Sequence, residues 1–269
     1  MLAQKIAETL NILKRGEATA LALNQTDGYY LAFSGGKDSQ VLYSLAQLSG
    51  VRFKAYYSVT SIDPPHNVYF IRDKYPDVEF VHHKENFFKL IEKKGLPTIR
   101  RRYCCERLKE NLGAGNVVLT GVRAEESKRR SSYAAIEIYS RRKEHVGKAR
   151  ERTFEQLEQQ EFQCIKGKDK LMVRPILNWT ETEIWEYIQR YNLPVNPCYA
   201  QVGRVGCMFC PFSNREKMEV YERQYPGFKR RLLQSLAVYW NRTKQHELFT
   251  PEEYYDWWKS KQSVKRYKA

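Results

Sequence analysis

The chain has 269 residues, of which 42% are hydrophobic and 29% charged, a balance that excludes a disordered chain and predicts a globular protein with a sizeable core. Lysine and arginine outnumber aspartate and glutamate by 46 to 31, and the net charge of +15 favours a polyanionic partner. No run approaches the roughly eighteen apolar residues of a membrane-spanning helix, and the first residues do not resemble a signal peptide, so we expect a cytoplasmic protein.

Residues 1–27 are predicted to form an N-terminal helix, because apolar residues recur there at helical spacing on a charged background. These residues are Leu2, Ile6, Leu10 and Leu13. Residues 28–212 follow as the main domain, in which short β-rich runs alternate with helical patterns. We predict strands at Tyr29–Phe33, Phe53–Val59, Val78–Val81 and Asn116–Thr120. Such an alternation implies an α/β fold with a doubly wound, mostly parallel sheet.

Two helices are predicted between the first three strands. Val41, Leu45 and Leu48 mark one face of the first helix, and Gly50 suits its C-terminal end. The second helix opens at Pro64-Pro65 and breaks at Pro76, since proline is tolerated in a first turn but not further along.

The alternation of strand and helix patterns is interrupted after the fourth predicted strand. Residues 131–170 are basic and then rich in Gln and Glu, and we interpret them as a mobile, partly helical insertion. Thr180 and Glu183 form a capping box ahead of a helix whose apolar stripe is Ile184, Ile188 and Tyr191. Residues 213–269 are predicted to be a helical, aromatic-rich extension, with a second capping box at Thr250 and Glu253.

The motif SGGKDS stands at the end of the first strand, where a helix begins. Glycines there allow main-chain amides to form a concave anion cradle, and the helix N-terminus adds partial positive charge. A lysine can place a full charge on a pyrophosphate, an aspartate can hold Mg²⁺, and the serines can add hydroxyl donors. The predicted nucleotide-binding residues of this loop are Ser34, Gly35, Gly36, Lys37, Asp38 and Ser39.

The motif resembles the SGGxDS signature of the PP-loop ATP pyrophosphatases, a superfamily with the adenine nucleotide α-hydrolase type of α/β fold. Its members bind ATP with Mg²⁺, cleave it between the α and β phosphates and adenylate a target. Some relatives bind an adenylyl sulfate instead. The resemblance implies that Lys37 and Asp38 are the catalytic residues and that an adenine nucleotide is the ligand.

Three further stretches resemble the phosphoadenylyl sulfate (PAPS) reductase-like branch of this superfamily. They are RYCCERLK, LTGVRAEESKRR and RPILNWTETEIWEYIQRYNLPVNPCYAQVGRVGCMFCPF. The second resembles a TGxRxxxSxxR segment, which assigns Gly121 and Arg123 to the nucleotide and Ser127 and Arg130 to the substrate. Asp63 follows the second strand, where α/β folds place ligand-facing loops, and is a further substrate candidate.

Five cysteines are candidate metal ligands. They are Cys104, Cys105, Cys198, Cys207 and Cys210. Thiolates at such spacing suit an iron–sulfur cluster or structural zinc, while a redox disulfide and unrelated buried cysteines remain alternatives. The resemblance to sulfonucleotide reductases favours a [4Fe-4S] cluster, with zinc as the alternative. Residues 196–212 would form a cysteine subdomain, with Cys164 outside it.

The resemblance leaves two enzyme activities and one binding role open. Sulfonucleotide reductases use a thiol in a C-terminal tail, whereas no cysteine follows Cys210 here, although Cys164 could substitute. The cysteine in NPCY, ahead of the C-x-x-C motif, makes the chain resemble the DNA phosphorothioation ATP pyrophosphatases. This resemblance implies DNA and a cysteine desulfurase or another sulfur donor as partners. A transfer RNA base is another acceptor. The third alternative is a nucleotide-binding, DNA-associated subunit with a cluster. The sequence leaves homo-oligomer formation open.

Overall fold

The computed structural model describes residues 1–140, 150–157, 159–167, 169–243 and 250–262. The chain divides into two compact units, each assembled from separate stretches of sequence. We name the larger one the sheet unit; it comprises Met1–Tyr57, Tyr69–Phe80 and Leu112–Pro197. The other is the cysteine unit, and it comprises Ser58–Val68, Val81–Asn111 and Cys198–Ala269. The domain bounds expected from the sequence are contiguous, whereas these units interleave along the chain.

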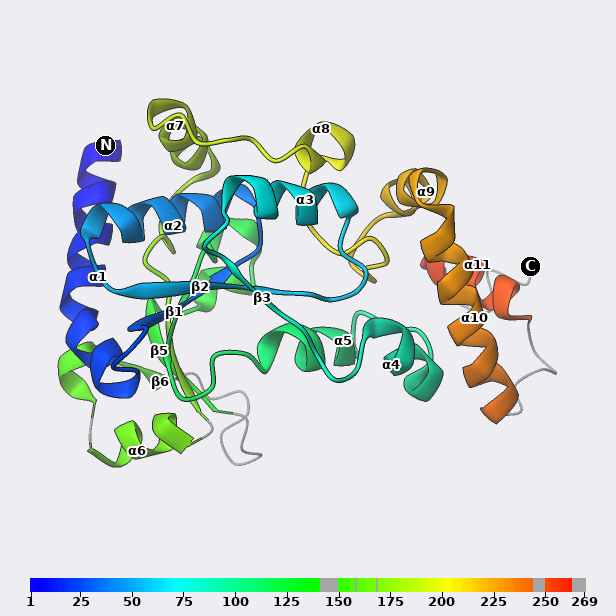
Figure 1. The fold of residues 1–269 in the computed structure, drawn as a ribbon, viewed down its shortest axis with the longest axis horizontal. Coiled ribbons are helices and arrows are strands. Elements are labelled where there is room, and N and C mark those ends of the chain that lie inside the picture. The colour runs from blue at the N-terminus through cyan, green and yellow to red at the C-terminus, as the bar shows by residue number, and fades with distance from the viewer. Residues whose placement is uncertain (141–149, 158, 168, 244–249, 263–269) are drawn as a thin grey trace. The chain divides into compact units, whose positions relative to one another are not determined.

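Seven strands form one sheet within the described residues, in the order β3-β2-β1-β4-β7-β5-β6 (Figure 1). The strands are β1 (Tyr29–Phe33), β2 (Phe53–Ser58), β3 (Glu79–Val81), β4 (Val117–Thr120), β5 (Ile136–Tyr139), β6 (Arg150–Glu151) and β7 (Lys170–Val173). Strand β1 is parallel to β2 and β4, and β4 is parallel to β7. The predicted α/β fold with a mostly parallel sheet is therefore confirmed, and the first four strands lie within two residues of their predicted bounds.

The region 131–170 differs from its prediction. We interpret it from sequence as an insertion outside the alternation, yet β5 pairs antiparallel with both β7 and β6 and extends the sheet. A buried ion pair, 2.6 Å between Arg174 and Glu137, holds β5 beside the end of β7. The expected helical part is present as α6 (Gln159–Gly167). Residues 141–149 of the predicted insertion lie outside the described residues.

The helices of the sheet unit follow the apolar patterns of the sequence. They are α1 (Leu2–Leu23), α2 (Lys37–Ser49), α3 (Pro65–Lys74, which the cysteine unit shares) and α7 (Glu181–Arg190). Most residues of the predicted stripes are buried, although Leu10, within α1, is only partly buried. Leu48 and Tyr191 are 51% and 39% exposed. Both lie at helix ends, where Ser49 is buried in place of Leu48 and where Tyr191 follows the last residue of α7. Gly50 ends α2 in the left-handed conformation, as predicted.

The cysteine unit is mainly helical. Its helices are α4 (Phe87–Lys94), α5 (Tyr103–Cys105), a π-helical turn (Glu106–Glu110), α8 (Cys198–Val202), α9 (Arg215–Gln224), α10 (Pro226–Thr243) and α11 (Pro251–Ser260). Apolar side chains from α4, α9, α10 and α11 share one core, which also includes Met208 and Phe209 of the cysteine-bearing loop. Both predicted capping boxes are present, at the starts of α7 and α11. The described helices include none that is both long and apolar enough to cross a membrane.

Candidate functional site

The glycine loop joins β1 to α2 and has the conformation that an anion cradle needs. Gly35 has φ of +75°, in the left-handed region that favours glycine, and Gly36 caps α2 with extended backbone. The helix begins at Lys37. The first amides of a helix have no acceptor within it and carry partial positive charge, so the start of α2 favours a negatively charged ligand.

The two serines of the loop brace it from within. Ser39 is buried, and its hydroxyl donates to the Gly36 carbonyl at 2.8 Å and accepts from the Ser34 amide at 3.2 Å. The Gly36 amide donates to Ser34 Oγ at 3.3 Å, and the two hydroxyls lie 3.1 Å apart. These bonds set the shape of the loop and occupy two of its amides. A direct contact of either serine with a nucleotide remains a prediction.

The carbonyl of Gly35 is held by two buried amide side chains that the sequence analysis did not single out. Asn196 Nδ2 donates to it at 2.9 Å and Gln40 Nε2 at 3.1 Å. The hydroxyl of Tyr75 donates to Gln40 Oε1 at 2.8 Å, which fixes that amide. A carbonyl with two donors cannot turn easily into the cradle, where it would repel a phosphate. Asn196 stands in the NPCY stretch, in which only the cysteine was predicted to have a role.

Arg123 lies behind the loop in a network of carboxylates. Its side chain is 2% exposed and donates to Asp38 at 2.6 Å, Glu125 at 2.8 Å and Glu181 at 2.5 Å. Asp38 and Glu181 also contact Lys37 Nζ, at 3.1 and 3.2 Å. Although burial opposes it, the nearby charge of Lys37 lowers the pKa of Glu181.

This network changes the expected role of Arg123. The sequence predicts a fork that binds phosphate or sulfate, whereas the structure directs the fork to three carboxylates and to the Trp179 carbonyl. Arg123 therefore positions Asp38 beside Lys37. A charged fork buried among carboxylates is costly to disturb, so we infer that it is a fixed part of the site. Glu125 and Glu181 were not predicted; the only available signal was their place in the first turns of helices that follow strands.

Gly121 directly follows β4 and lies against the start of α2. A Cβ atom there would be 2.9 Å from the main-chain carbon and oxygen of Asp38. Only glycine allows this close approach, so the predicted Gly121 acts on the shape of the loop. Ser127 and Arg130 are engaged locally: the Ser127 hydroxyl accepts from the Arg130 amide at 3.3 Å, and Arg130 forms an ion pair with Glu126. Their contact with a substrate remains a prediction.

The five predicted metal ligands all belong to the cysteine unit, and so does Asp63. Asp63 is buried and accepts from the Thr60 amide at 2.6 Å, while Thr60 Oγ1 lies 3.6 Å from Cys207 Sγ. The Lys109 ammonium faces Cys207, Asp63 and Cys105, and the charge of Cys207 raises the pKa of Lys109. The structure therefore places Asp63 in the surroundings of the cysteines.

Cys104 and Cys105 are hydrogen-bonded to each other, and their pKa values shift in opposite directions. The hydrogen bond to Cys105, together with burial, raises the pKa of Cys104. The same hydrogen bond, with help from the Arg102 and Lys109 cations, lowers the pKa of Cys105 to about 6, although burial opposes it. Burial raises the pKa of Cys198 to about 11.

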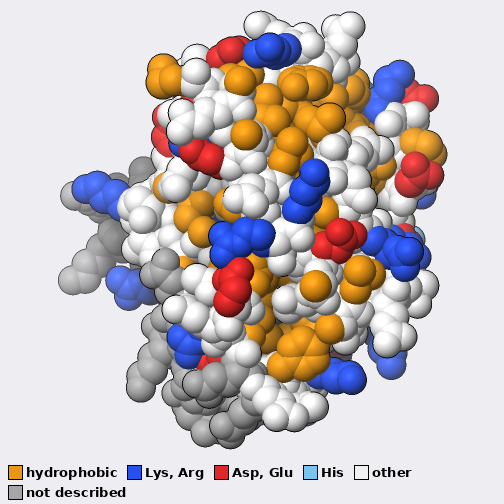
Figure 2. Space-filling view, turned by 90° about the vertical axis from the view of Figure 1, so that its left-hand side faces the viewer, with side chains coloured by type: hydrophobic (Ala, Val, Ile, Leu, Met, Phe, Trp, Pro, Cys, Tyr) orange, Lys and Arg blue, Asp and Glu red, His pale blue; other side chains and the backbone are white. Residues whose placement is uncertain are grey.

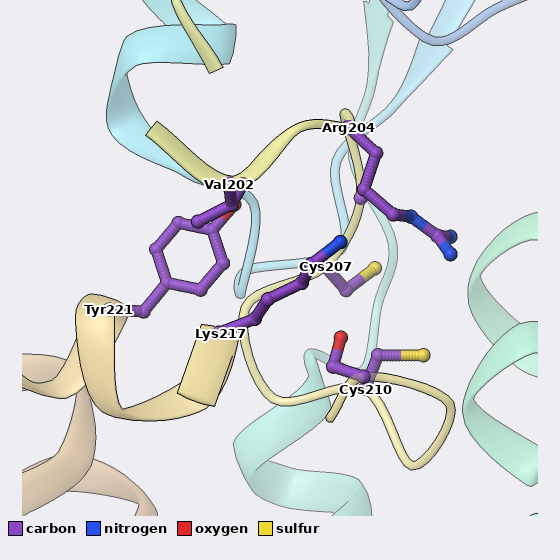
Figure 3. Close-up of a pocket in the computed structure, with 8 residues that line it drawn as sticks. Val202, Arg204, Cys207, Cys210, Lys217 and Tyr221 are labelled. Atoms are coloured by element: carbon purple, nitrogen blue, oxygen red, sulfur yellow. The ribbon is translucent and has the colours of Figure 1, made fainter. Parts of the chain in front are cut away.

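Cys207 and Cys210 line a pocket of about 10 Å³ together with Arg204, Lys217 and Tyr221. Figure 3 shows both thiols pointing to the same side of this pocket, the side on which the Arg204 guanidinium also lies. A space of this size holds about one water molecule and excludes a nucleotide. Burial raises the pKa of Cys207, and the Lys109 cation, which lowers it, does not offset this effect. A metal that binds Cys207 must therefore displace its proton.

The cysteine set fits a thiolate-bound group by chemistry and by neighbourhood. Cys207 lies near enough to Cys104 and to Cys210 for their charges to interact, and burial together with Cys198 and Cys207 raises the pKa of Tyr221. Among the residues that the structure describes, no three Cys, His, Asp or Glu side chains stand close enough to hold a metal ion. The donors are therefore gathered in one unit without being in ligand positions. Cys164 belongs to the sheet unit, on α6.

Comparison with known proteins gives relatives in both sequence and structure. An uncharacterized protein of Methanocaldococcus jannaschii is 27% identical over 226 residues, which cover 80% of this chain and 49% of the relative. The adenosine 5'-phosphosulfate reductase of Allochromatium vinosum is 27% identical over 116 residues, which cover 41% of this chain and 35% of the relative. This chain spans less than half the length of these relatives.

The solved structures that resemble this chain are more distant. The PAPS reductase of Candida auris is 16% identical with a TM-score of 0.45, covering 74% of this chain and 87% of that one. The U34-tRNA thiolase of Methanococcus maripaludis, solved with a [4Fe-4S] cluster, is 14% identical with a TM-score of 0.41, covering 90% of this chain and 78% of that one.

A family model also matches most of the chain. The model of the phosphoadenosine phosphosulfate reductase domain matches residues 28–213, from the residue before β1 to just beyond the last cysteine. This span includes the glycine loop, Arg123 and all the predicted metal ligands. It confirms the family that the three sequence stretches indicated. The chain belongs to the phosphoadenosine phosphosulfate reductase domain family.

Proposed function

We propose that this protein binds ATP at the glycine loop, cleaves it between the α and β phosphates and adenylates an acceptor that then receives sulfur. The observation that carries the proposal is the loop itself: Gly35 at φ of +75°, the start of α2, and Lys37 beside it. An anion cradle at a helix N-terminus suits a polyphosphate chain. The family membership supports an adenine nucleotide as the ligand.

The loop residues divide the work between binding and charge neutralisation. The first amides of α2 and the Lys37 ammonium would hold the β and γ phosphates, and Asp38 would hold Mg²⁺. Asp38 and Glu181 neutralise Lys37, so a bound phosphate would compete with them for the ammonium. Arg123 would keep Asp38 oriented throughout.

The proposed reaction consists of two successive displacements at phosphorus. An acceptor oxygen attacks the α phosphorus, the bond to the bridging oxygen breaks, and pyrophosphate leaves. The terminal sulfur of a persulfide then attacks the activated centre and AMP leaves, after which a thiol reduces the S–S bond and the sulfur stays on the acceptor. We propose a DNA backbone phosphate as acceptor, because a basic protein attracts a polyanion. A cysteine desulfurase would supply the persulfide.

The cysteine group would hold a [4Fe-4S] cluster, with zinc as the alternative. Its four-thiolate site would be drawn from Cys198, Cys207, Cys210 and one of Cys104 and Cys105. A bound cluster supplies redox or sulfur-binding chemistry, whereas zinc supplies structural support. The chain's own part is to gather thiols, of which Cys105 is stabilised as a thiolate by the hydrogen bond with Cys104 and by the Arg102 and Lys109 cations.

Sulfonucleotide reduction is the second candidate, because the Allochromatium vinosum relative bears that name. In that reaction a cysteine thiolate attacks the sulfate sulfur of the adenylyl sulfate. The bond from sulfur to the bridging oxygen breaks, the nucleotide leaves, and S-sulfocysteine forms. A thiol reductant then releases sulfite. The same glycine loop would hold the nucleotide phosphate.

Anaerobically purified protein offered ATP, adenylyl sulfate and PAPS separates these candidates. The proposal expects pyrophosphate and AMP from ATP, stimulated by DNA, with a loss of about 100-fold or more in Lys37→Met. Lys54→Met is the matched control, since Lys54 also forms an ion pair, with Glu79 at 2.6 Å, away from the loop. Sulfite from either sulfate ester would establish the reductase instead. DNA binding with turnover that Lys37→Met leaves unchanged would mean a binding subunit.

A further inference from the structure

The positive charge of the chain is concentrated in the cysteine unit. Lys and Arg outnumber Asp and Glu by 23 to 12 in its sequence, against 23 to 19 in the larger sheet unit. Figure 2 shows the balanced charge on the side of the molecule where α1 lies, with blue and red side chains interspersed. A polyanion should therefore be attracted mainly to the cysteine unit.

One surface of this unit combines cations with an exposed aromatic ring. We name it the Phe212 surface; it comprises Phe212, Arg102 and Lys261, together with the exposed residues Ile99, Arg100 and Arg101, which directly precede Arg102 in the sequence. Phe212 is 50% exposed, and the Arg102 guanidinium lies 5.2 Å from the centre of its ring. Ile99, 55% exposed, adds a second apolar side chain. An aromatic ring stacked with a guanidinium and left half open to solvent is typical of platforms on which nucleobases stack.

The cations of this surface are placed by local structure. Arg101 closes a turn with Thr98, its amide donating to Thr98 Oγ1 at 3.0 Å, and this turn presents Ile99 and Arg100. Lys261 donates to the Pro211 carbonyl at 2.7 Å, so its ammonium lies next to the segment that carries Phe212. Exposed cations near a base platform can follow a phosphate backbone.

The surface also adjoins the cysteines. Phe212 follows Cys210 by two residues, Lys261 donates to the carbonyl of Pro211, the residue between them, and Arg102 is hydrogen-bonded to Cys105. We propose that the Phe212 surface binds a single strand of DNA, with one unstacked base on the Phe212 ring and its phosphates on Arg100, Arg101 and Lys261. This inference rests on the proposed function for its choice of DNA. It gives the DNA acceptor a binding surface that adjoins the cysteine thiols.

Fluorescence anisotropy of a labelled single-stranded DNA, with no ATP present, tests the surface independently of turnover. Phe212→Leu should weaken binding about 5- to 150-fold, as the loss of one base stack predicts, while Phe212→Trp should retain it. Val238→Leu is the matched control, because Val238 is 51% exposed on α10, outside this surface. Arg100→Gln with Arg101→Gln should lower the slope of log K against log salt by about 1.4.

A 2-aminopurine base in the strand reports stacking directly, and its fluorescence should fall on binding to the wild type but not to Phe212→Leu. Equal binding by wild type, Phe212→Leu and Phe212→Trp would overturn the proposal, and so would tighter binding of duplex DNA or of RNA of the same sequence. Phe212-dependent DNA binding without pyrophosphate release would uphold the surface and refute the proposed activity. Pyrophosphate release without Phe212-dependent DNA binding would refute the surface and uphold the proposed activity.

Discussion

The glycine loop and the cysteine group differ in how much of their geometry the polypeptide makes by itself. The loop is fixed by hydrogen bonds to Gly35 and Gly36 and by the Arg123 network, so its shape exists without a ligand. The thiols are gathered, but no three of the described candidate donors occupy ligand positions. Thiolates repel one another, and a lysine lies among them. A phosphate site can therefore be preformed, whereas a thiolate site is completed by the metal that it binds.

The largest effect is expected when a thiol is removed. Cys207→Ser should abolish iron and sulfide binding in anaerobically purified protein, because Cys207 is coupled to both Cys104 and Cys210. Cys164→Ser, in the sheet unit, should retain the full iron content. Metal analysis and the visible absorption spectrum measure the cluster content of both variants. Zinc without iron in the wild type would refute the cluster and leave the nucleotide site standing.

The next largest effect is expected at the close contact behind the loop. Gly121→Ala places a methyl group 2.9 Å from the Asp38 main chain, so the start of α2 must move. We expect a loss of about 1–3 kcal/mol in the free energy of unfolding and at least tenfold weaker ATP binding. Gly167→Ala is the control, since a Cβ there meets open space. Calorimetry measures both quantities, and unchanged ATP binding in Gly121→Ala would contradict a preformed cradle.

A smaller change tests the positioning role of Arg123. Arg123→Lys keeps one charge but cannot span Asp38, Glu125 and Glu181 together, so Asp38 should lose its orientation. We expect kcat to fall about tenfold with KM for ATP nearly unchanged, and Arg123→Ala to be worse. Arg152→Lys, which disturbs a two-pronged pair with Glu161, is the control. A rise in KM alone would instead indicate that Arg123 binds the phosphate chain.

The smallest effect concerns the stability of the cysteine unit. Burial opposes ionisation of Glu222, but hydrogen bonds from Tyr255, Lys259 and Lys229 outweigh it and lower its pKa. Stabilisation by the carboxylate is therefore present above the ordinary value of 4.5 and is lost as pH falls through the lower folded value. Denaturant titrations of Glu222→Gln should show a loss of about 1–3 kcal/mol at pH 7 that shrinks below pH 4.5. Exposed Glu252→Gln should show no such dependence.

Local sequence signals predicted the elements around the glycine loop well. Strand β1 has the predicted bounds, and the capping residues of α7 and α11 are where the pattern Thr-x-x-Glu places them. These features depend on residues within a few positions of one another, so a sequence can show them. The alternation also predicted the parallel sheet, because its hydrophobic periods differ between strands and helices.

Long-range partners could not be predicted in the same way. The hydrogen bond from Asn196 to Gly35 joins residues 161 positions apart, and the Arg123–Glu181 pair joins residues 58 apart. Arginine beside a strand end suits phosphate as well as carboxylate, and only the structure distinguishes the two here. The short strand β5 was missed because charged sequence surrounds it and its buried Glu137 reads as a surface residue until Arg174 is placed beside it.

The proposed chemistry requires the glycine loop to bind the phosphates of an adenine nucleotide. A crystal structure of the protein with Mg²⁺ and α,β-methylene ATP, which cannot be cleaved between the α and β phosphates, would show whether it does. The account predicts triphosphate density at the first turn of α2, with Lys37 turned from Asp38 and Glu181 to a phosphate oxygen. An empty loop in crystals whose nucleotide is bound elsewhere would contradict it.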